Sequence, residues 1–285
     1  MAMRPKMMDE IYGWFLHRRC ELWNQAGPDG QCCPILEKQR VNYREIPRES
    51  AVYYPESIFG NPSSSIIFLG INPGQSELKP KETNREKATG RQEEIKELVS
   101  CPNSQRNWNM GLEAYIQHHL HYNLEHPKEK VIAGAVRILR ETWGCSNDVA
   151  LSMLTFMNVA HCKCPNYDRH FRKMKPPQGF FWNRCGVQTL KVLSILKPKA
   201  VVCMGGPVQY WVEYVHGASS PQFYAPWKLD CDLEAKWYGR TMPLVNTETK
   251  LRIPLVMSYH TANWGKFNAG IDVIVGQLRG ILFGK

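Results

Sequence analysis

Ile66-Ile67-Phe68-Leu69-Gly70-Ile71-Asn72-Pro73-Gly74 is the stretch that decides the fold of this 285-residue chain. Its apolar half is typical of a buried parallel strand, and the strand ends in a turn with one polar side chain between glycines. Such a break fits the mouth of an α/β sheet, where ligands bind. Pro73 fixes one backbone angle and the glycines allow close backbone approach, so Asn72 is held on a stiff loop. Alone, the stretch is also compatible with a plain turn in which Asn72 caps the next helix.

Three further segments repeat this pattern of an apolar strand that ends in a polar or glycine-containing turn. They are residues 154–165, 200–206 and 253–266. Residues 186–196 have a helical pattern and precede the second of these strands. The sequence therefore predicts an α/β fold with a central, mostly parallel sheet flanked by helices. A lone histidine such as His260 is more often structural, so its functional interpretation depends on the companion segments.

These elements, in this order, resemble the uracil-DNA glycosylase superfamily. Residues 70–74 resemble the first motif of its mismatch-specific uracil/thymine branch, and the surroundings resemble the iron–sulfur branch, usually called family 4. The second likeness covers residues from about 57 to 75 and 154 to 275, roughly half of the chain. It is carried by Phe59-Gly60-Asn61-Pro62, by the Asn-Val-x-x-Cys segment from Asn158 to Cys162, by Cys185, by Lys197-Pro198-Lys199 and by Gly205.

The resemblance implies a base-flipping enzyme that cleaves an N-glycosidic bond. It implies that Asn72 positions a water molecule and that His260 stabilises O2 of the departing base. Asn158 would read the Watson–Crick edge of a pyrimidine, since one amide offers both a donor and an acceptor. The other expected substrate-binding residues lie in or beside the two loops: Gly70, Ile71, Pro73, Gly74, Gln75, Asn263, Trp264 and Lys266.

The chain also departs from the family 4 pattern. Asn72 replaces an acidic residue, Thr261 replaces a proline, and the usual leucine wedge is missing, so Trp264 is the candidate wedge. No aromatic residue lies between Gly74 and Trp108, where the family has a ring that stacks on uracil or excludes bulk at C5. We therefore expect a roomier pocket for uracil, or for a mismatched or bulky C5-modified pyrimidine. A modified base of phage DNA would give the enzyme a defence role rather than a repair role.

The resemblance also implies a role for some of the cysteines. It implies a [4Fe–4S] cluster on Cys20, Cys33, Cys162 and Cys185. Twelve residues separate the N-terminal pair, more than in the branch, and Cys32 and Cys164 are alternative ligands. A zinc site and free thiols remain open, whereas a disulfide framework is not expected in a cytoplasmic protein. The cysteines that sit singly are expected to be small packing residues: Cys101, Cys145, Cys203 and Cys231.

Charge favours a polyanionic partner. Lys plus Arg exceed Asp plus Glu by 36 − 26 = 10, and the pI is near 9.1. Basic side chains on DNA phosphates release condensed counterions, which favours binding. No apolar stretch reaches the roughly 18 residues of a membrane span, and the polar N-terminus lacks the apolar core of a signal peptide. We therefore expect a cytoplasmic monomer that binds DNA and no membrane.

Chain length predicts a single domain. We expect residues 1–285 to form one glycosylase-like domain with a helical insertion at approximately 77–150, because the span from Gly74 to Asn158 exceeds what the family core requires. Two other function classes stay open. One is a catalytically weak module of the same fold that binds DNA or damaged bases, and the other is a hydrolase of small nucleosides or nucleotides.

Overall fold

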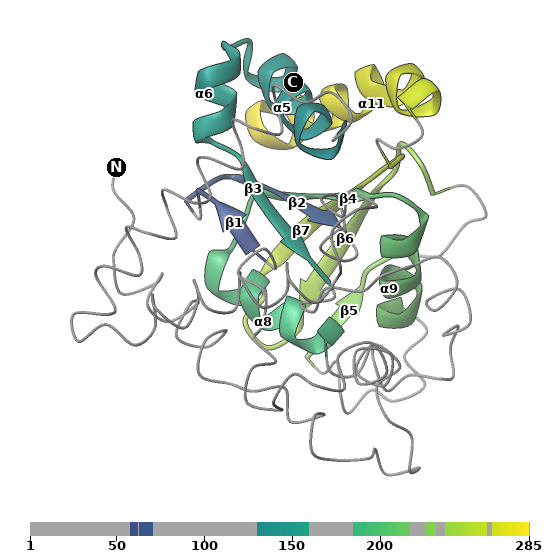
Figure 1. The fold of residues 1–285 in the computed structure, drawn as a ribbon. Coiled ribbons are helices and arrows are strands. Elements are labelled where there is room, and N and C mark those ends of the chain that lie inside the picture. The colour runs from purple at the N-terminus through teal and green to yellow at the C-terminus, as the bar shows by residue number, and fades with distance from the viewer. Residues whose placement is uncertain are drawn as a thin grey trace, which may run out of the picture.

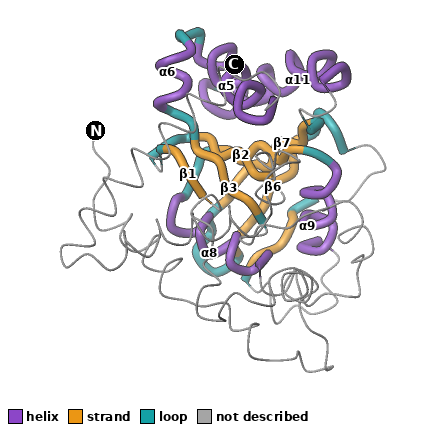
Figure 2. Tube along the Cα trace, viewed as in Figure 1, coloured by secondary structure: helices purple, strands orange, loops and turns teal. Residues whose placement is uncertain are grey.

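The computed structural model describes residues 58–61, 63–70, 130–159, 185–216, 226–231, 237–260 and 264–284. At its centre is a seven-stranded sheet with the order β1-β3-β2-β4-β7-β6-β5 (Figures 1 and 2). The strands are β1 (Ile58–Gly60), β2 (Ile66–Gly70), β3 (Thr155–Asn158), β4 (Ala200–Met204), β5 (Trp227–Leu229), β6 (Thr241–Asn246) and β7 (Arg252–Ser258).

The sheet is mixed rather than mostly parallel. Its central strands β3, β2, β4 and β7 run parallel to one another. Strand β1 at one edge and strands β6 and β5 at the other pair antiparallel. Burial accounts for the difference, since β2 and β4 are buried at every position whereas β6 alternates buried and more exposed residues. The predicted α/β class is confirmed, with the parallel arrangement confined to the middle of the sheet.

Helices cover both faces of the sheet. They are α5 (Lys130–Trp143), α6 (Asn147–Ser152), α8 (Val187–Leu196), α9 (Gly206–His216) and α11 (Trp264–Phe283). Helices α5, α6 and α11 lie above the sheet in Figure 1, and α8 and α9 lie on the opposite side. Helix α5 packs against both α6 and α11, α11 packs against β7, and α9 packs against β4 and β5. The result is a three-layer arrangement around one core.

Helix α11 shows why these segments are helical and where they pack. Its buried residues recur at helical spacing, so that one face enters the core: Phe267, Ile271, Ile274, Val275 and Leu278. Helix α5 has the same pattern with Ile132, Ala135, Val136, Ile138 and Leu139. The described residues of the expected insertion, 130–150, thus contain α5 and most of α6, which pack in the common core. Its remaining residues lie outside the described part of the chain.

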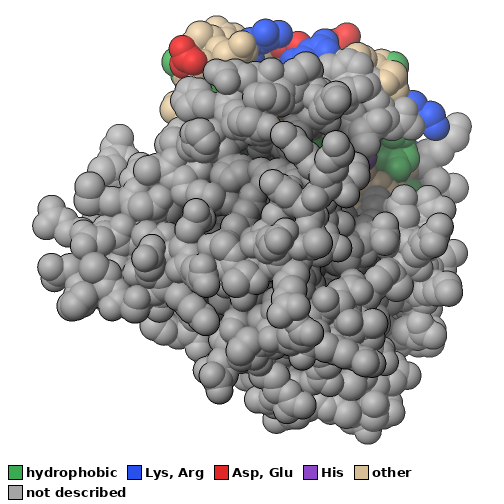
Figure 3. All heavy atoms as spheres, viewed as in Figure 1, with side chains coloured by type: hydrophobic (Ala, Val, Ile, Leu, Met, Phe, Trp, Pro, Cys, Tyr) green, Lys and Arg blue, Asp and Glu red, His purple; other side chains and the backbone are tan. Residues whose placement is uncertain are grey.

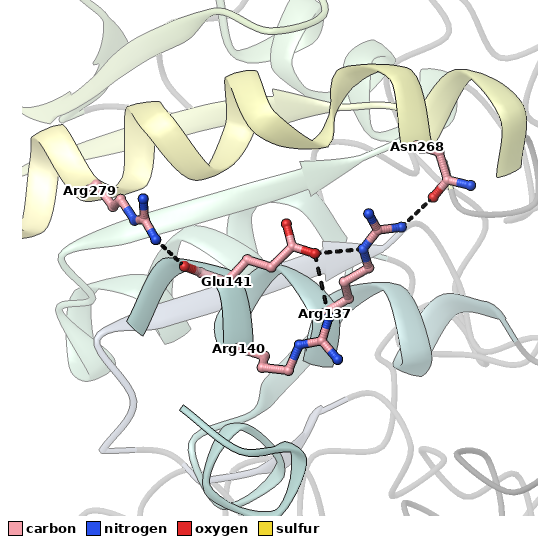
Figure 4. A network of polar contacts seen from close by, with 5 residues as sticks. All are labelled: Arg137, Arg140, Glu141, Asn268 and Arg279. Atoms are coloured by element: carbon pink, nitrogen blue, oxygen red, sulfur yellow. Dashed lines mark hydrogen bonds and ion pairs between the residues drawn. The ribbon is translucent and has the colours of Figure 1, made fainter. Parts of the chain in front are cut away.

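A polar network joins α5 to α11 (Figure 4). Arg137 donates from Nη1 to Asn268 Oδ1 at 2.6 Å and from Nε to Glu141 Oε1 at 2.7 Å. Arg279 donates from Nη2 to the Glu141 carbonyl at 2.6 Å and from Nε to the Thr142 carbonyl at 3.3 Å. Arg279 thereby satisfies backbone acceptors that the last turn of α5 leaves without helical partners. The network fixes α11 across α5.

Candidate functional site

Carboxyl ends of the parallel strands meet at one edge of the sheet. Gly70 ends β2 and pairs in register with Asn158, which ends β3. Gly205 follows β4, and its backbone N–H donates to the carbonyl of Ser258 at the end of β7, at 2.9 Å. His260 stands two residues beyond Ser258. Four segments that are far apart in the sequence therefore contribute to one edge.

Neighbouring strands β2 and β4 lie at a change of winding direction. The next parallel strand after β2 in the chain is its neighbour β3 on one side, and the next parallel strand after β4 is its neighbour β7 on the other side. Ligands of open α/β sheets bind beyond the carboxyl ends of the strands at such a reversal of strand order. Asn158 at the end of β3 and His260 beyond the end of β7 flank this position on its two sides.

Gly70 makes room for side chains of β3. A Cβ atom at this position would lie 2.7 Å from Asn158 Oδ1 and 2.8 Å from Phe156 Cζ, so no larger residue fits without a shift. Asn158 is only 3% exposed, and the next backbone N–H, of Val159, donates to the Gly70 carbonyl at 3.0 Å. The Asn158 amide is thus held beside the end of β2 by the sheet itself.

Gly205 makes room for the side chain of His260 in the same way. Its φ of +90° is one that glycine adopts readily and other residues rarely do. A Cβ atom at Gly205 would lie 2.6 Å from His260 Cβ and 3.1 Å from His260 Cδ2. The half-buried imidazole therefore rests directly on the Gly205 backbone at the end of β4. Asn158 at the end of β3 and His260 beyond β7 therefore pack against Gly70 and Gly205, the glycines at the ends of the inner strands β2 and β4.

Several expected site residues are placed and others are not. Gly70, Asn158 and His260 come together at the carboxyl edge, and Lys266 lies exposed in the first turn of α11. Trp264 begins α11, but its side chain is outside the described part. The other expected residues of the two loops lie outside the described residues: Ile71, Asn72, Pro73, Gly74, Gln75 and Asn263.

Phe156 is an aromatic residue at the site that the sequence analysis missed. Its ring lies against Gly70, next to the Asn158 amide. The expectation of a pocket without a stacking ring considered only residues after Gly74. Because side chains two apart in a strand share a face, Phe156 and Asn158 could have been assigned to the same side of β3 from the sequence.

A second aromatic feature adjoins His260. The rings of Tyr238 and Tyr259 are stacked, with centroids 3.8 Å apart and planes inclined by 14°. The Nζ atom of Lys266 lies 5.9 Å from the centroid of the Tyr259 ring. Burial raises the pKa of Tyr238, and the neighbouring phenols of Tyr259 and Tyr210 raise it further, so its hydroxyl is neutral near pH 7. No local sequence signal links Tyr238 to Tyr259, although the position of Tyr259 beside His260 does mark it.

The cysteine predictions are placed only in part. Cys185 is buried at the start of the turn that leads into α8, and its carbonyl accepts a hydrogen bond from Thr189 Oγ1 at 3.1 Å. The other expected ligands and their alternatives lie outside the described residues: Cys20, Cys32, Cys33, Cys162 and Cys164. Within the described ranges, no group of three or more His, Cys, Asp or Glu side chains could hold a metal ion. The cluster therefore stays a prediction.

Three of the cysteines that sit singly pack as expected, and Cys101 lies outside the described residues. Cys203 in β4 has no exposed surface, and burial strongly raises the pKa of its thiol. Cys145 and Cys231 are partly buried and pack against the core. Trp227 and Trp237 are buried core residues as well.

Comparisons with known proteins leave the family open. No protein-family model matches the chain, and a search of curated protein sequences gives no match. None of the helices in the described ranges has the length and apolar character to span a bilayer. The sequence motifs and the geometry of the carboxyl edge are therefore the features that indicate a function.

Proposed function

We propose that this protein is a monofunctional DNA glycosylase that flips a pyrimidine nucleotide out of DNA and hydrolyses its N-glycosidic bond. The observation that carries the proposal is the pair of side chains, Asn158 and His260, held over Gly70 and Gly205 at the carboxyl edge of the parallel strands. An amide and an imidazole at this edge match the motifs that resemble uracil-DNA glycosylases. The net charge of +10 agrees with a polyanionic substrate.

His260 supplies the main electrostatic contribution in this mechanism. When the bond between C1′ of the sugar and the base nitrogen breaks, its electron pair leaves with the base, and negative charge develops on O2. A ring N–H of His260 donates a hydrogen bond to that oxygen and stabilises the transition state more than the bound substrate. The backbone of Gly205 fixes the imidazole, which reduces the reorganisation needed during the reaction.

Asn158 and Asn72 have complementary roles in the proposal. The Asn158 amide binds the polar edge of the flipped base with one donor and one acceptor, and its burial keeps that orientation fixed. Asn72, in the loop that follows β2, orients a water molecule toward C1′. The water oxygen forms the new bond to C1′ and gives up a proton, and the departing base takes up a proton. A sugar with oxocarbenium character needs only a weak nucleophile, so an amide suffices for this task.

The proposed substrates are uracil and mismatched or bulky C5-modified pyrimidines, including modified bases of phage DNA. The ring of Phe156 beside Gly70 provides an apolar contact at the floor of the site, in place of the ring that the first motif lacks. The [4Fe–4S] cluster proposed on Cys20, Cys33, Cys162 and Cys185 would stabilise the fold and take no part in bond cleavage.

Base excision assays test the proposal. Purified protein is incubated with duplexes that carry uracil, a mismatched thymine or a C5-modified cytosine, and the products are treated with alkali. The expected result is strand breakage at the target base for at least one duplex. Gel shifts without strand breakage would instead indicate that the protein is a catalytically weak DNA-binding module of the same fold.

A further inference from the structure

The Tyr238–Tyr259 pair, an exposed ring stacked on a partly buried one, lies at the carboxyl edge next to the proposed catalytic histidine. Tyr259 directly precedes His260, so the position of one ring is tied to the position of the other. Figure 3 shows a group of exposed hydrophobic side chains below the right-hand end of α11, with Lys or Arg side chains beside it. The glycosylase mechanism assigns no role to these tyrosines.

Packing gives the two rings different environments. Helix α11 lies against Tyr259, because a Cβ atom at Gly270 would be 3.6 Å from its Cδ2 atom. Tyr238 lies in the turn before β6 and keeps 36% of its surface exposed. Its hydroxyl reaches the start of α9, where a Cβ atom at Gly206 would be 3.5 Å away. Tyr259 is therefore the inner ring, packed against α11, and Tyr238 is the accessible outer ring, whose hydroxyl contacts the start of α9.

Charge beside the pair favours a nucleic acid. The ammonium group of Lys266 lies near the Tyr259 ring, on the first turn of α11, and Lys266 is exposed. Stacked aromatic rings that adjoin a cation are the combination that holds single-stranded nucleic acid, since bases stack on the rings and phosphates meet the cation. A phenol that is uncharged near pH 7 adds no repulsion toward a phosphate.

We propose that Tyr238 and Tyr259 form a stacking platform for a nucleobase adjacent to the flipped nucleotide, with Lys266 on the neighbouring phosphate. The proposal rests on the proposed function, because it requires DNA at the carboxyl edge. Stacking on Tyr238 compensates part of the stacking lost when the target base leaves the duplex. Because every base has an aromatic face, the platform is insensitive to the identity of the flanking base.

A second exposed aromatic pair provides a matched control. Trp143 and Phe283 meet edge to face, with centroids 5.0 Å apart, and Trp143 is also 36% exposed. Phe283 ends α11, whereas Lys266 lies in its first turn. The 20 residues of α11 span about 30 Å, so this pair lies far from His260 along the helix. Trp143→Ala therefore removes an equally exposed ring without touching the platform.

The experiment measures binding of the full-length chain to a labelled duplex with a tetrahydrofuran abasic-site analogue, by fluorescence anisotropy at several salt concentrations. Tyr238→Ala is expected to lower affinity by roughly 5- to 150-fold, the range for one base–aromatic stack. Tyr238→Phe and Trp143→Ala are expected to bind as the wild type does. Lys266→Gln should reduce the slope of log affinity against log salt by about 0.7–0.9, whereas Tyr238→Ala should leave the slope unchanged.

Three outcomes would overturn the platform. These are wild-type affinity in Tyr238→Ala, an equal loss in Tyr238→Phe, which would indicate a hydroxyl contact instead, and an equal loss in Trp143→Ala. The outcome for the proposed function is separate. A wild-type protein that binds the abasic duplex through Tyr238 but excises no base refutes the glycosylase and keeps the platform. Excision that proceeds while Tyr238→Ala binds normally refutes the platform alone.

Discussion

The two edges of the parallel strands use polar side chains and glycines in different ways. At the amino edge, Thr155 Oγ1 donates to the Asn61 carbonyl, and Asn61 Nδ2 donates to the Ser152 carbonyl at 2.9 Å. Gly60 there makes room for backbone, because a Cβ atom would collide with the Leu154 carbonyl. At the carboxyl edge, Gly70 and Gly205 make room for side chains instead.

This difference indicates that the amino edge stabilises the fold and that the carboxyl edge presents side chains to a ligand. Hydrogen bonds from side chains to the backbone at the amino edge connect the start of β3 to the segment before β2, and they stabilise the fold. Glycines at the carboxyl edge allow an amide and an imidazole to lie over neighbouring strands, where a ligand of the sheet would bind. Substitutions at the carboxyl edge should therefore change activity, and substitutions at the amino edge should change stability.

The largest expected effect at the carboxyl edge concerns the predicted cluster. Cys185 precedes α8, which joins the end of β3 to the start of β4, and Cys203 lies within β4. Anaerobically purified protein should be brown, and Cys185→Ser should abolish the visible absorption, whereas Cys203→Ser should keep it. Colourless wild-type protein with stoichiometric zinc would favour the zinc alternative, and metal-free protein would show that the cysteine match is coincidental.

His260→Ala should have the next largest effect. Removing the donor to the departing base should lower the single-turnover excision rate by roughly 10²–10³-fold, as the loss of one transition-state donor does elsewhere. Thermal unfolding should change little, because the side chain is only half buried at the surface. An unchanged excision rate in this variant would remove His260 from the mechanism and weaken the contrast between the edges.

Gly205→Ala tests whether the glycine positions the imidazole. The added Cβ would meet His260 Cβ at 2.6 Å, so the ring must move, and a displacement of about 1 Å can cost about 10²-fold in rate. Alanine at a φ of +90° also costs about 1–3 kcal/mol of stability. Combining the substitution with His260→Ala should give little further loss of rate. A full additive loss would show that Gly205 acts through something other than His260.

Much of this edge could be predicted from the sequence. Apolar runs bounded by glycine or polar turns located β2, β3, β4 and β7, and a helical pattern over residues 186–196 located α8. Parallel strands bring their carboxyl ends to one edge, which is why Asn158 and His260 could be expected together. The order of the motifs, through the resemblance to uracil-DNA glycosylases, assigned these two residues their expected roles.

Other parts of the site depend on contacts that no local pattern specifies. Tyr238 and Tyr259 meet because the turn before β6 lies beside the end of β7, and that pairing is set by the antiparallel register of the two strands. The antiparallel edge strand β5 alternates buried and exposed residues, but at three residues it is too short for this alternation to be recognised in the sequence. The close approach of Gly205 to His260 is a tertiary contact as well.

Thr155→Val tests the amino edge. Thr155 is 1% exposed, and its hydroxyl donates a hydrogen bond to the Asn61 carbonyl at this junction. Valine keeps the shape but removes this hydrogen bond. Because the Asn61 carbonyl still accepts from the Ser64 backbone N–H at 2.9 Å, the free energy of unfolding should fall by about 0.5–1.5 kcal/mol, the net contribution of one hydrogen bond. Denaturant unfolding measures the loss, and Thr155→Ser, which keeps the hydroxyl, is the control. The excision rate of the folded protein should stay at the wild-type value; a large decrease would mean that both edges serve catalysis.

Lys197→Gly should have the smallest effect, and its sign is opposite. Lys197 caps α8 in the left-handed region with a φ of 46°, and its backbone N–H donates to the Leu193 carbonyl at 2.9 Å. Glycine relieves about 1–2 kcal/mol of backbone strain, and its greater freedom in the unfolded chain offsets about 0.4–1 kcal/mol of that gain. The net gain of up to about 1 kcal/mol should raise the melting temperature by a few degrees. Lys197→Ala keeps the strained backbone and should give no such gain, which separates backbone relief from loss of charge.

Because Lys197 lies at the amino edge, away from the proposed DNA-binding surface, both variants should excise bases at the wild-type rate. Slower excision in both would indicate that this lysine contacts the DNA.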